Sequence, residues 1–184
     1  MERIKILALS GSLRAASYNT AAIKAMQMLA PGYVEITLFP IGDLPLFNPD
    51  REGEHIPPLE KLLGSLKGSD GLIIASPEYA HGISGPMKNA LDWLVSGVEF
   101  PYKPIMLINT SPRASHAQES LKEVLRTMSG IVVENACLSI PLLSSDLDAE
   151  GIVASEDMVS MLSAGLNTFC IEIETLTHNG CQTG

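Results

Sequence analysis

The stretch Ile4–Gly11, with the sequence IKILALSG, decides the fold class of this chain. Its apolar residues follow one another almost without a break, which is typical of a strand buried on both faces of a parallel sheet. Ser17 then provides a cap for an amphipathic helix over Tyr18–Leu29. A buried strand that leads through a polar loop into such a helix predicts the start of a strand–helix–strand unit.

The same alternation continues along the chain. Further strands are expected at Val34–Phe39, Gly71–Ser76, Pro104–Asn109 and Ile131–Ile140. Further helices are expected around Leu59–Leu66, from Ser84-Gly85-Pro86 onward, after a capping box of Ser115 with Gln118, and after a cap at Ser155. Five strands that alternate with five helices predict an α/β fold in which helices cover both faces of a parallel sheet. The proline-rich segment 39–58 and the acidic segment Ser144–Glu150 are expected to be surface loops.

Composition excludes several classes of protein. The 184 residues are 46% apolar and 18% charged, which predicts one packed domain over 1–184. Twelve Lys and Arg against 21 Asp and Glu give a charge of −9, which argues against binding nucleic acid or an anionic membrane. No apolar run approaches the roughly 18 residues of a membrane span, and no signal-peptide pattern begins the chain, so we expect a cytoplasmic protein. The three cysteines and four histidines lack metal-ligand spacing, so no metal site is expected.

The first candidate binding loop follows the strand at Ile4–Ser10. It combines hydroxyl groups, one arginine, one amide and the start of a helix, which together favour a phosphate monoester. It matches neither G-x-G-x-x-G nor the Walker sequence, so a Rossmann dinucleotide site and a nucleoside triphosphatase are disfavoured. The alternative is that these residues only cap the helix, but capping alone does not call for Arg14.

The second candidate loop, Ser76–Gly85, carries Tyr79 at a strand end. An exposed tyrosine there offers a flat surface for a ring system, and the glycines let backbone N–H groups approach the polar edge of a planar ligand. Alternatively, Tyr79 packs on the rim of the core and the glycines only make turns. The loop by itself leaves both interpretations open.

Several pieces taken together resemble the NADPH-dependent FMN reductase family. They are Ser10-Gly11-Ser12-Leu13-Arg14 with Ser17 and Asn19, Leu44-Pro45-Leu46-Phe47-Asn48, Pro77-Glu78-Tyr79, and Lys88-Asn89-Ala90-Leu91-Asp92-Trp93. Their order and strand context match over roughly residues 4–130. The resemblance implies a flavodoxin-like three-layer sandwich with a five-stranded parallel sheet of order 2-1-3-4-5.

The resemblance also implies residue roles. The FMN phosphate would be held by Ser10, Ser12, Arg14, Ser17, Asn19 and Thr20. The isoalloxazine ring would be lined by Pro77, Glu78, Tyr79 and Ala80, with Ser111 in the loop Thr110–Arg113 on its other side. Many members have Asn after Pro-Glu-Tyr, where this chain has Ala80-His81, and many have a glycine-rich third loop, where this chain has Ser111-Pro112-Arg113-Ala114-Ser115. Arg113 is the candidate for the 2′-phosphate of NADPH.

The implied activity is hydride transfer from NADPH or NADH, through non-covalently bound FMN, to a small-molecule electron acceptor. Quinones, free flavins, azo compounds and metal oxyanions are all candidate acceptors. No catalytic side chain is expected, because the flavin carries the chemistry. The resemblance further implies a homodimer or homotetramer. The alternatives are an electron carrier like flavodoxin, against which the long Ser12–Asn19 loop argues, and a redox sensor without turnover.

Overall fold

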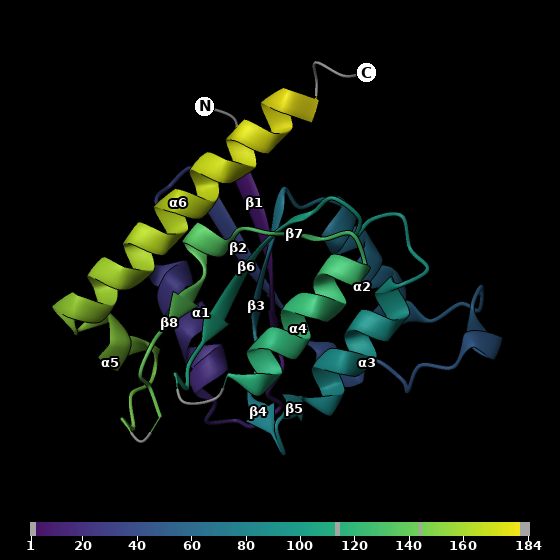
Figure 1. Ribbon diagram of the computed structural model, residues 1–184, viewed down its shortest axis with the longest axis horizontal. Coiled ribbons are helices and arrows are strands. Elements are labelled where there is room, and N and C mark those ends of the chain that lie inside the picture. The colour runs from purple at the N-terminus through teal and green to yellow at the C-terminus, as the bar shows by residue number, and fades with distance from the viewer. Residues whose placement is uncertain (1–2, 113–114, 144, 181–184) are drawn as a thin grey trace.

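The computed structural model describes residues 3–112, 115–143 and 145–180. Its centre is a twisted sheet in which every strand pair is parallel (Figure 1). The strands, in spatial order, are β2 (Val34–Phe39), β1 (Ile4–Ser10), β3 (Gly71–Ala75), β6 (Pro104–Asn109), and a last position shared by β7 (Ile131–Val132) and β8 (Leu138–Ser139). The order confirms the expected 2-1-3-4-5 arrangement, which is that of flavodoxin-like proteins.

Strand β1 is buried on both faces, as its unbroken apolar run predicts. Ile6 pairs with Ile36 of β2 and Leu7 with Leu72 of β3. Successive side chains point to opposite faces, so Ile6 joins the apolar core on one side of the sheet and Leu7 the core on the other.

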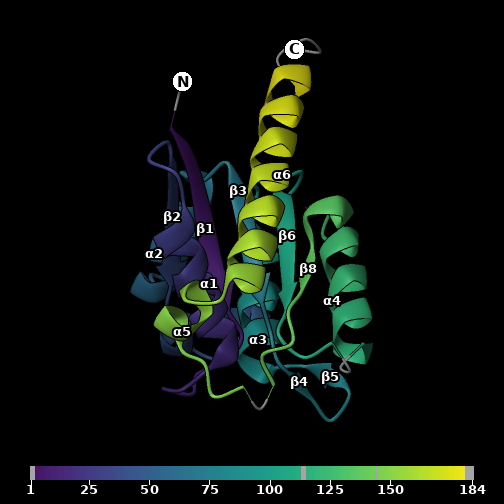
Figure 2. The same cartoon turned by 90° about the vertical axis from the view of Figure 1, so that its left-hand side faces the viewer.

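Helices cover both faces of the sheet and complete three layers (Figures 1 and 2). One layer consists of α1 (Tyr18–Leu29), α5 (Ala149–Val153) and α6 (Glu156–Gly180). The other consists of α2 (Pro57–Lys67), α3 (Gly85–Leu94) and α4 (His116–Thr127). Among the described helices, α6 included, none is long and apolar enough to cross a membrane.

The structure corrects four details of the sequence-based expectation. The strand expected at Ile131–Ile140 is interrupted by a 3-10 turn, η3 (Glu134–Ala136), because the polar pair Glu134-Asn135 lies exposed in its middle. The acidic segment ends in a helix rather than a loop, since Asp148 Oδ1 caps α5 by accepting from Gly151 N–H at 2.9 Å. Segment 39–58 contains two 3-10 turns, η1 (Ile41–Asp43) and η2 (Pro49–Arg51). The fourth correction concerns α4: its expected Ser115 capping bond does not form.

The segment after β2 is fastened to α3. Asn89 Oδ1 accepts a hydrogen bond from Phe47 N–H at 2.8 Å, and the Pro45 carbonyl accepts from both Asn89 Nδ2 (3.0 Å) and Trp93 Nε1 (2.8 Å). The Phe47 and Trp93 rings also meet edge to face at 5.1 Å. Two motifs that lie far apart in the sequence therefore form one structural unit.

Candidate functional site

Three loops meet at one edge of the sheet. They follow the carboxyl ends of the neighbouring strands β1, β3 and β6 and span residues 11–17, 76–84 and 110–115. Strand β1 is where the order reverses, because β2 lies on one side of it and β3 on the other. In sheets of this kind, ligands bind beyond the carboxyl ends of the strands at such a reversal. This edge, at the lower end of Figure 1, is the candidate site.

The hydroxyl groups of the first loop are held by one another and by the loop backbone. Ser10 Oγ lies 2.9 Å from Thr20 Oγ1 and accepts from Ser12 N–H at 3.4 Å. Ser12 Oγ accepts from Arg14 N–H at 3.4 Å, and Ser17 Oγ caps α1 by accepting from Thr20 N–H at 3.3 Å. Four hydroxyls and the N-terminus of α1 are thus brought together in one region, which suits a phosphate group.

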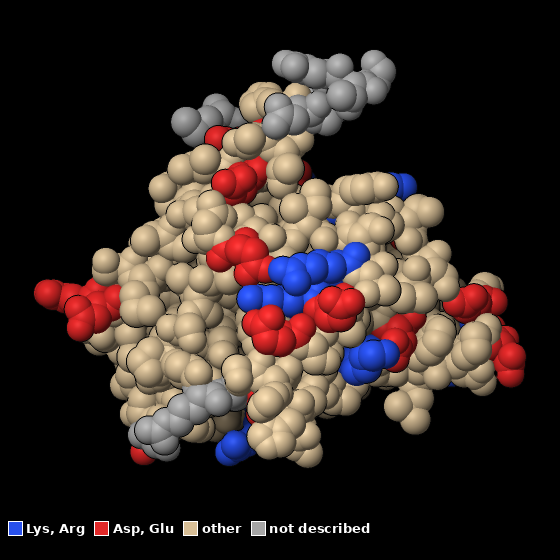
Figure 3. Space-filling model, viewed as in Figure 1, with Lys and Arg blue, Asp and Glu red and all other residues tan. Residues whose placement is uncertain are grey.

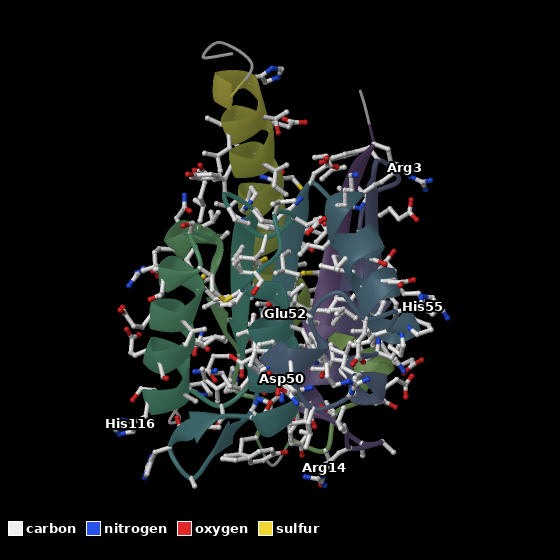
Figure 4. All side chains as sticks on the ribbon, turned by 90° about the vertical axis from the view of Figure 1, so that its right-hand side faces the viewer. Arg3, Arg14, Asp50, Glu52, His55 and His116 are labelled. Atoms are coloured by element: carbon white, nitrogen blue, oxygen red, sulfur yellow. The ribbon has the colours of Figure 1, made fainter. Side chains whose placement is uncertain are left out.

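The Arg14 side chain is exposed and extends away from the body of the protein (Figure 4). Together with Ser17 and Thr20 it lines a cavity of about 740 Å³ that runs beside α1 as far as Glu150. The described residues 77–82 are not part of that lining. The cavity therefore adjoins the expected phosphate residues and not the expected ring-binding segment.

Gly11 lies where the first two loops cross. A Cβ atom at this position would lie 2.5 Å from Ser76 Oγ and 2.8 Å from Ser84 Oγ, so a side chain cannot fit without movement of both. Ser84 is fully buried, and its Oγ donates to the Gly11 carbonyl at 2.7 Å while lying 3.4 Å from Ser76 Oγ. Sequence reasoning treated Ser84 as a helix start and missed Ser76, although a hydroxyl residue directly after a buried strand was the available signal.

Asn19 connects the first loop with the third. Its side chain is 5% exposed, and its Oδ1 accepts from Thr110 Oγ1 at 3.2 Å. The amide oxygen is therefore engaged within the protein, and the group that can donate to a ligand is Nδ2. In the third loop Ser111 is half-buried and its N–H donates to Asn109 Oδ1 at 2.9 Å. Arg113, the residue expected at the 2′-phosphate of NADPH, lies outside the described residues.

The second loop is a small antiparallel hairpin, which the sequence did not predict. Strands β4 (Glu78–Tyr79) and β5 (Gly82–Ile83) are joined by Ala80 and His81, with φ angles of 50° and 61°. A tight two-residue turn between twisted strands requires positive φ at both positions, which Asn and Gly adopt most easily. Tyr79 is 52% exposed, so it does not pack on the rim of the core and presents a surface to a planar ligand.

The Glu78 carboxylate lies between the turn of its own hairpin and the first turn of α4. Its Oε2 accepts from Ala117 N–H at 2.9 Å, and its Oε1 lies 3.0 Å from His81 Nδ1. The hydrogen bond from Ala117, ahead of the contribution from His81, lowers the pKa of Glu78 below its ordinary value. Both oxygens are engaged, so we expect Glu78 to line a bound ring with its backbone rather than with its side chain.

Several charges along α4 are paired. Over α4, Lys122 lies 3.0 Å from Glu134 Oε2 and 3.3 Å from Glu119 Oε1, and Arg126 lies 2.6 Å from Glu134 Oε1 (Figure 3). The bond to Glu134 is the main reason that the pKa of Lys122 is raised. In residues 3–112, 115–143 and 145–180, no three His, Cys, Asp or Glu side chains are grouped as a metal site.

The chain has clear relatives. The family model of the NADPH-dependent FMN reductases matches residues 4–143. The chain is 29% identical to an NAD(P)H-dependent FMN reductase of Pseudomonas aeruginosa over 179 residues, which cover 94% of this chain and 97% of that protein. It is 30% identical to a 2-hydroxy-1,4-benzoquinone reductase of a Burkholderia species, over 90% of this chain and 94% of that one. Among solved structures, the flavoenzyme NAD(P)H:(acceptor) oxidoreductase FerB from Paracoccus denitrificans superposes with a TM-score of 0.80 at 30% identity, over 94% of this chain and 98% of that one.

Proposed function

Because the chain belongs to the NADPH-dependent FMN reductase family, it is an FMN-dependent NAD(P)H oxidoreductase, and we propose that quinones are the acceptors it reduces best. The observation that carries the proposal is the hairpin with its exposed Tyr79, which lies at the same sheet edge as the hydroxyl-rich first loop. A flat, open aromatic surface suits a flat, mostly apolar acceptor better than a compact charged one. The Burkholderia relative, whose name specifies a benzoquinone substrate, supports the same acceptor class.

The residues present fit the cofactor. A phosphate monoester needs donors and positive charge, and the first loop supplies hydroxyls, α1 N–H groups and one cation on a long side chain. We infer that the residues that hold the phosphate are Ser10, Ser12, Arg14, Ser17, Asn19 and Thr20. We infer that the residues beside the ring are Pro77, Glu78, Tyr79, Ala80 and Ser111.

The chemistry that FMN supplies when bound is the acceptance of hydride and its onward transfer. The protein binds and orients: the first loop holds the phosphate, the hairpin supports the ring, and the third loop closes the other side. No side chain is required as an acid or base in this scheme. An electron carrier of flavodoxin type is disfavoured because the relatives matched over nearly the whole chain are reductases.

We further propose that the protein works as a homodimer or homotetramer in the cytoplasm. Large apolar side chains with substantial exposure, such as Val98 (86%), Tyr102 (76%) and Leu46 (84%), are available for contact with a second copy. Light scattering coupled to size-exclusion chromatography measures the mass directly. A monomer of 19.7 kDa at micromolar concentration would contradict the assembly.

The test of the activity uses protein reconstituted with FMN, desalted and kept anaerobic. We expect a bound yellow chromophore that bleaches when NADPH or NADH is added and recovers when a benzoquinone follows. Flavin that stays oxidised with both nicotinamides would contradict the oxidoreductase assignment. Recovery with an azo dye or free flavin at a higher kcat/KM than with any quinone would contradict the acceptor class.

A further inference from the structure

The first turn of α4 obtains its hydrogen-bond partner from a distant part of the chain. The residue at its cap, Ser115, makes no capping bond with its side chain. Instead the Ala117 N–H donates to Oε2 of Glu78, 39 residues earlier. The Glu78 side chain is only 12% exposed. A carboxylate placed at a helix N-terminus satisfies an open N–H group and interacts favourably with the helix dipole.

The other carboxylate oxygen closes the hairpin on itself. Oε1 of Glu78 lies 3.0 Å from Nδ1 of His81, whose own ring is 77% exposed and meets the His116 ring edge to face at 4.8 Å. The turn at Ala80-His81 has positive φ at both residues without a glycine or an asparagine. A hairpin of two-residue strands is not stable by itself, so its position depends on contacts such as these and on the packing of Ile83 against the core.

The contacts of Glu78 with Ala117 and His81 connect elements on two sides of the candidate site. The hairpin carries Tyr79, and α4 follows the loop that begins at Thr110. Figures 1 and 2 both place β4 and β5 directly beside the start of α4. In Figure 4 His116 lies at the same end of the molecule as Arg14, with the hairpin between them in that view.

We propose that Glu78 is a positioning residue of the flavin site: its carboxylate ties the hairpin that carries Tyr79 to the first turn of α4, and so holds the ring-binding surface in place. The inference rests on the proposed function, because the surface it positions is the one assigned to the ring. Glu78 acts through Tyr79 and the hairpin backbone and does not touch the reacting atoms. The bonds it accepts are charge-assisted, which makes them about twice as strong as bonds between neutral groups.

The first measurement is the Kd for FMN, determined from the quenching of flavin fluorescence on binding. Glu78→Ala removes both bonds, and we expect the Kd for FMN to rise about tenfold. Glu78→Gln keeps an oxygen for the Ala117 N–H but loses the charge, so its Kd should rise less, by about threefold. The matched control is Glu119→Gln, which removes a carboxylate from the same turn of α4 without touching the hairpin, and its Kd should equal that of the wild type.

The second measurement separates positioning from a general loss of stability. In a double-mutant cycle, Tyr79→Ala is made in the wild type and in the Glu78→Ala background. When Glu78 acts through Tyr79, the second substitution weakens FMN binding by a smaller factor in the variant than in the wild type. If Glu78→Ala proves unfolded at the assay temperature by circular dichroism, the Glu78→Gln background replaces it in the cycle.

The outcomes are distinct. Unchanged Kd in folded Glu78→Ala, or losses from the two substitutions that multiply as independent factors, would overturn the positioning role. A wild type that binds no FMN in the same titration would overturn the proposed function, and this inference with it. Exchange of the Ala117 amide proton, measured by NMR without flavin, should be faster in Glu78→Ala than in Glu119→Gln; equal rates would contradict the bond itself.

Discussion

The first loop and the hairpin serve the same candidate site but are built in different ways. In residues 10–20 the serine and threonine hydroxyl groups bond to partners at most ten positions away, and the helix cap is local. In residues 76–84 the decisive bond is Glu78 to Ala117, across 39 residues. The first loop is joined to a regular strand and helix, whereas the hairpin has left-handed residues that are not glycine.

The difference shows which contacts fix the geometry of each half of the site. The local bonds among the serine and threonine hydroxyls form whenever β1 and α1 form, whereas Gly11 and Asn19 also bond to Ser84 and Thr110 of the other loops. A tethered arrangement depends on the packing of a second element, here α4. We therefore expect substitutions in the first loop to act on anchoring of the phosphate, and substitutions in the hairpin to act on placement of the ring.

The largest effect is expected from Gly11→Ala, at the crossing of the two regions. The new Cβ would lie 2.5 Å from Ser76 Oγ and 2.8 Å from Ser84 Oγ, and Ser84 is held by its own bonds. We expect the free energy of unfolding to fall by about 2 kcal/mol, as for other overpacked sites. Equilibrium unfolding in urea measures this change in the free energy of unfolding.

The control for that prediction is Gly64→Ala. Gly64 lies in α2, where a Cβ atom would meet no neighbour within 4 Å among the described residues beyond its own helix backbone, and alanine is the better helix former. Its free energy of unfolding should rise by about 0.5–1 kcal/mol. If Gly11→Ala behaves like Gly64→Ala, the close crossing of the loops is wrong.

The next effect tests the first loop as a phosphate anchor. Arg14→Ala should raise the Kd for FMN about tenfold, because a charge-assisted contact to the phosphate is lost. It should leave the Kd for riboflavin, which lacks the phosphate, unchanged. Lys24→Ala removes a cation that lines the same cavity farther along α1, and it serves as the control. Equal losses for FMN and riboflavin in Arg14→Ala would place Arg14 elsewhere than at the phosphate.

A smaller effect is expected from a substitution that relieves the backbone strain in the hairpin turn. Ala80 has a φ of 50°, and asparagine tolerates this conformation better than alanine. Ala80→Asn should raise the free energy of unfolding by about 0.5–1 kcal/mol. Ala164→Asn, at an exposed position of α6, should lower it by about 0.5 kcal/mol because asparagine is a poor helix former. Thermal unfolding of the two variants should shift in opposite directions.

The smallest effect concerns acid stability. The Ala117 N–H lowers the pKa of Glu78 in the folded protein below the ordinary value of 4.5, so the unfolded chain binds more protons in that range. The stabilisation is therefore complete above pH 4.5 and is lost as the pH falls through the folded pKa. The difference in unfolding midpoint between wild type and Glu78→Gln should shrink as the pH falls from above 4.5 through the lowered pKa of Glu78 in the folded protein. A difference that stays constant over this range would show that the carboxylate charge is not involved.

Much of the fold was predictable because the decisive signals are local. Unbroken apolar runs identified the strands, Ser17 capped α1 as expected, and the strand order followed from the resemblance. The fifth strand was extended too far, because an apolar pattern does not show that Glu134-Asn135 will turn outward. The capping box at Ser115 was wrong: the Ser115 side chain makes no capping bond, and Glu78 accepts from the Ala117 N–H in the first turn of α4.

The amino-acid sequence by itself determined the strand–helix alternation, the hydroxyl-rich first loop and the family to which the chain belongs. These depend on periodicity and on residues that are neighbours in the chain. Only the tertiary structure decided that Ser76 and Ser84 enclose Gly11, that Asn19 bonds to Thr110, and that Glu78 accepts a hydrogen bond from the first turn of α4. The physical reason is that a hydrogen bond is set by distance and direction in space, and packing of the sheet brings together groups that the sequence keeps far apart.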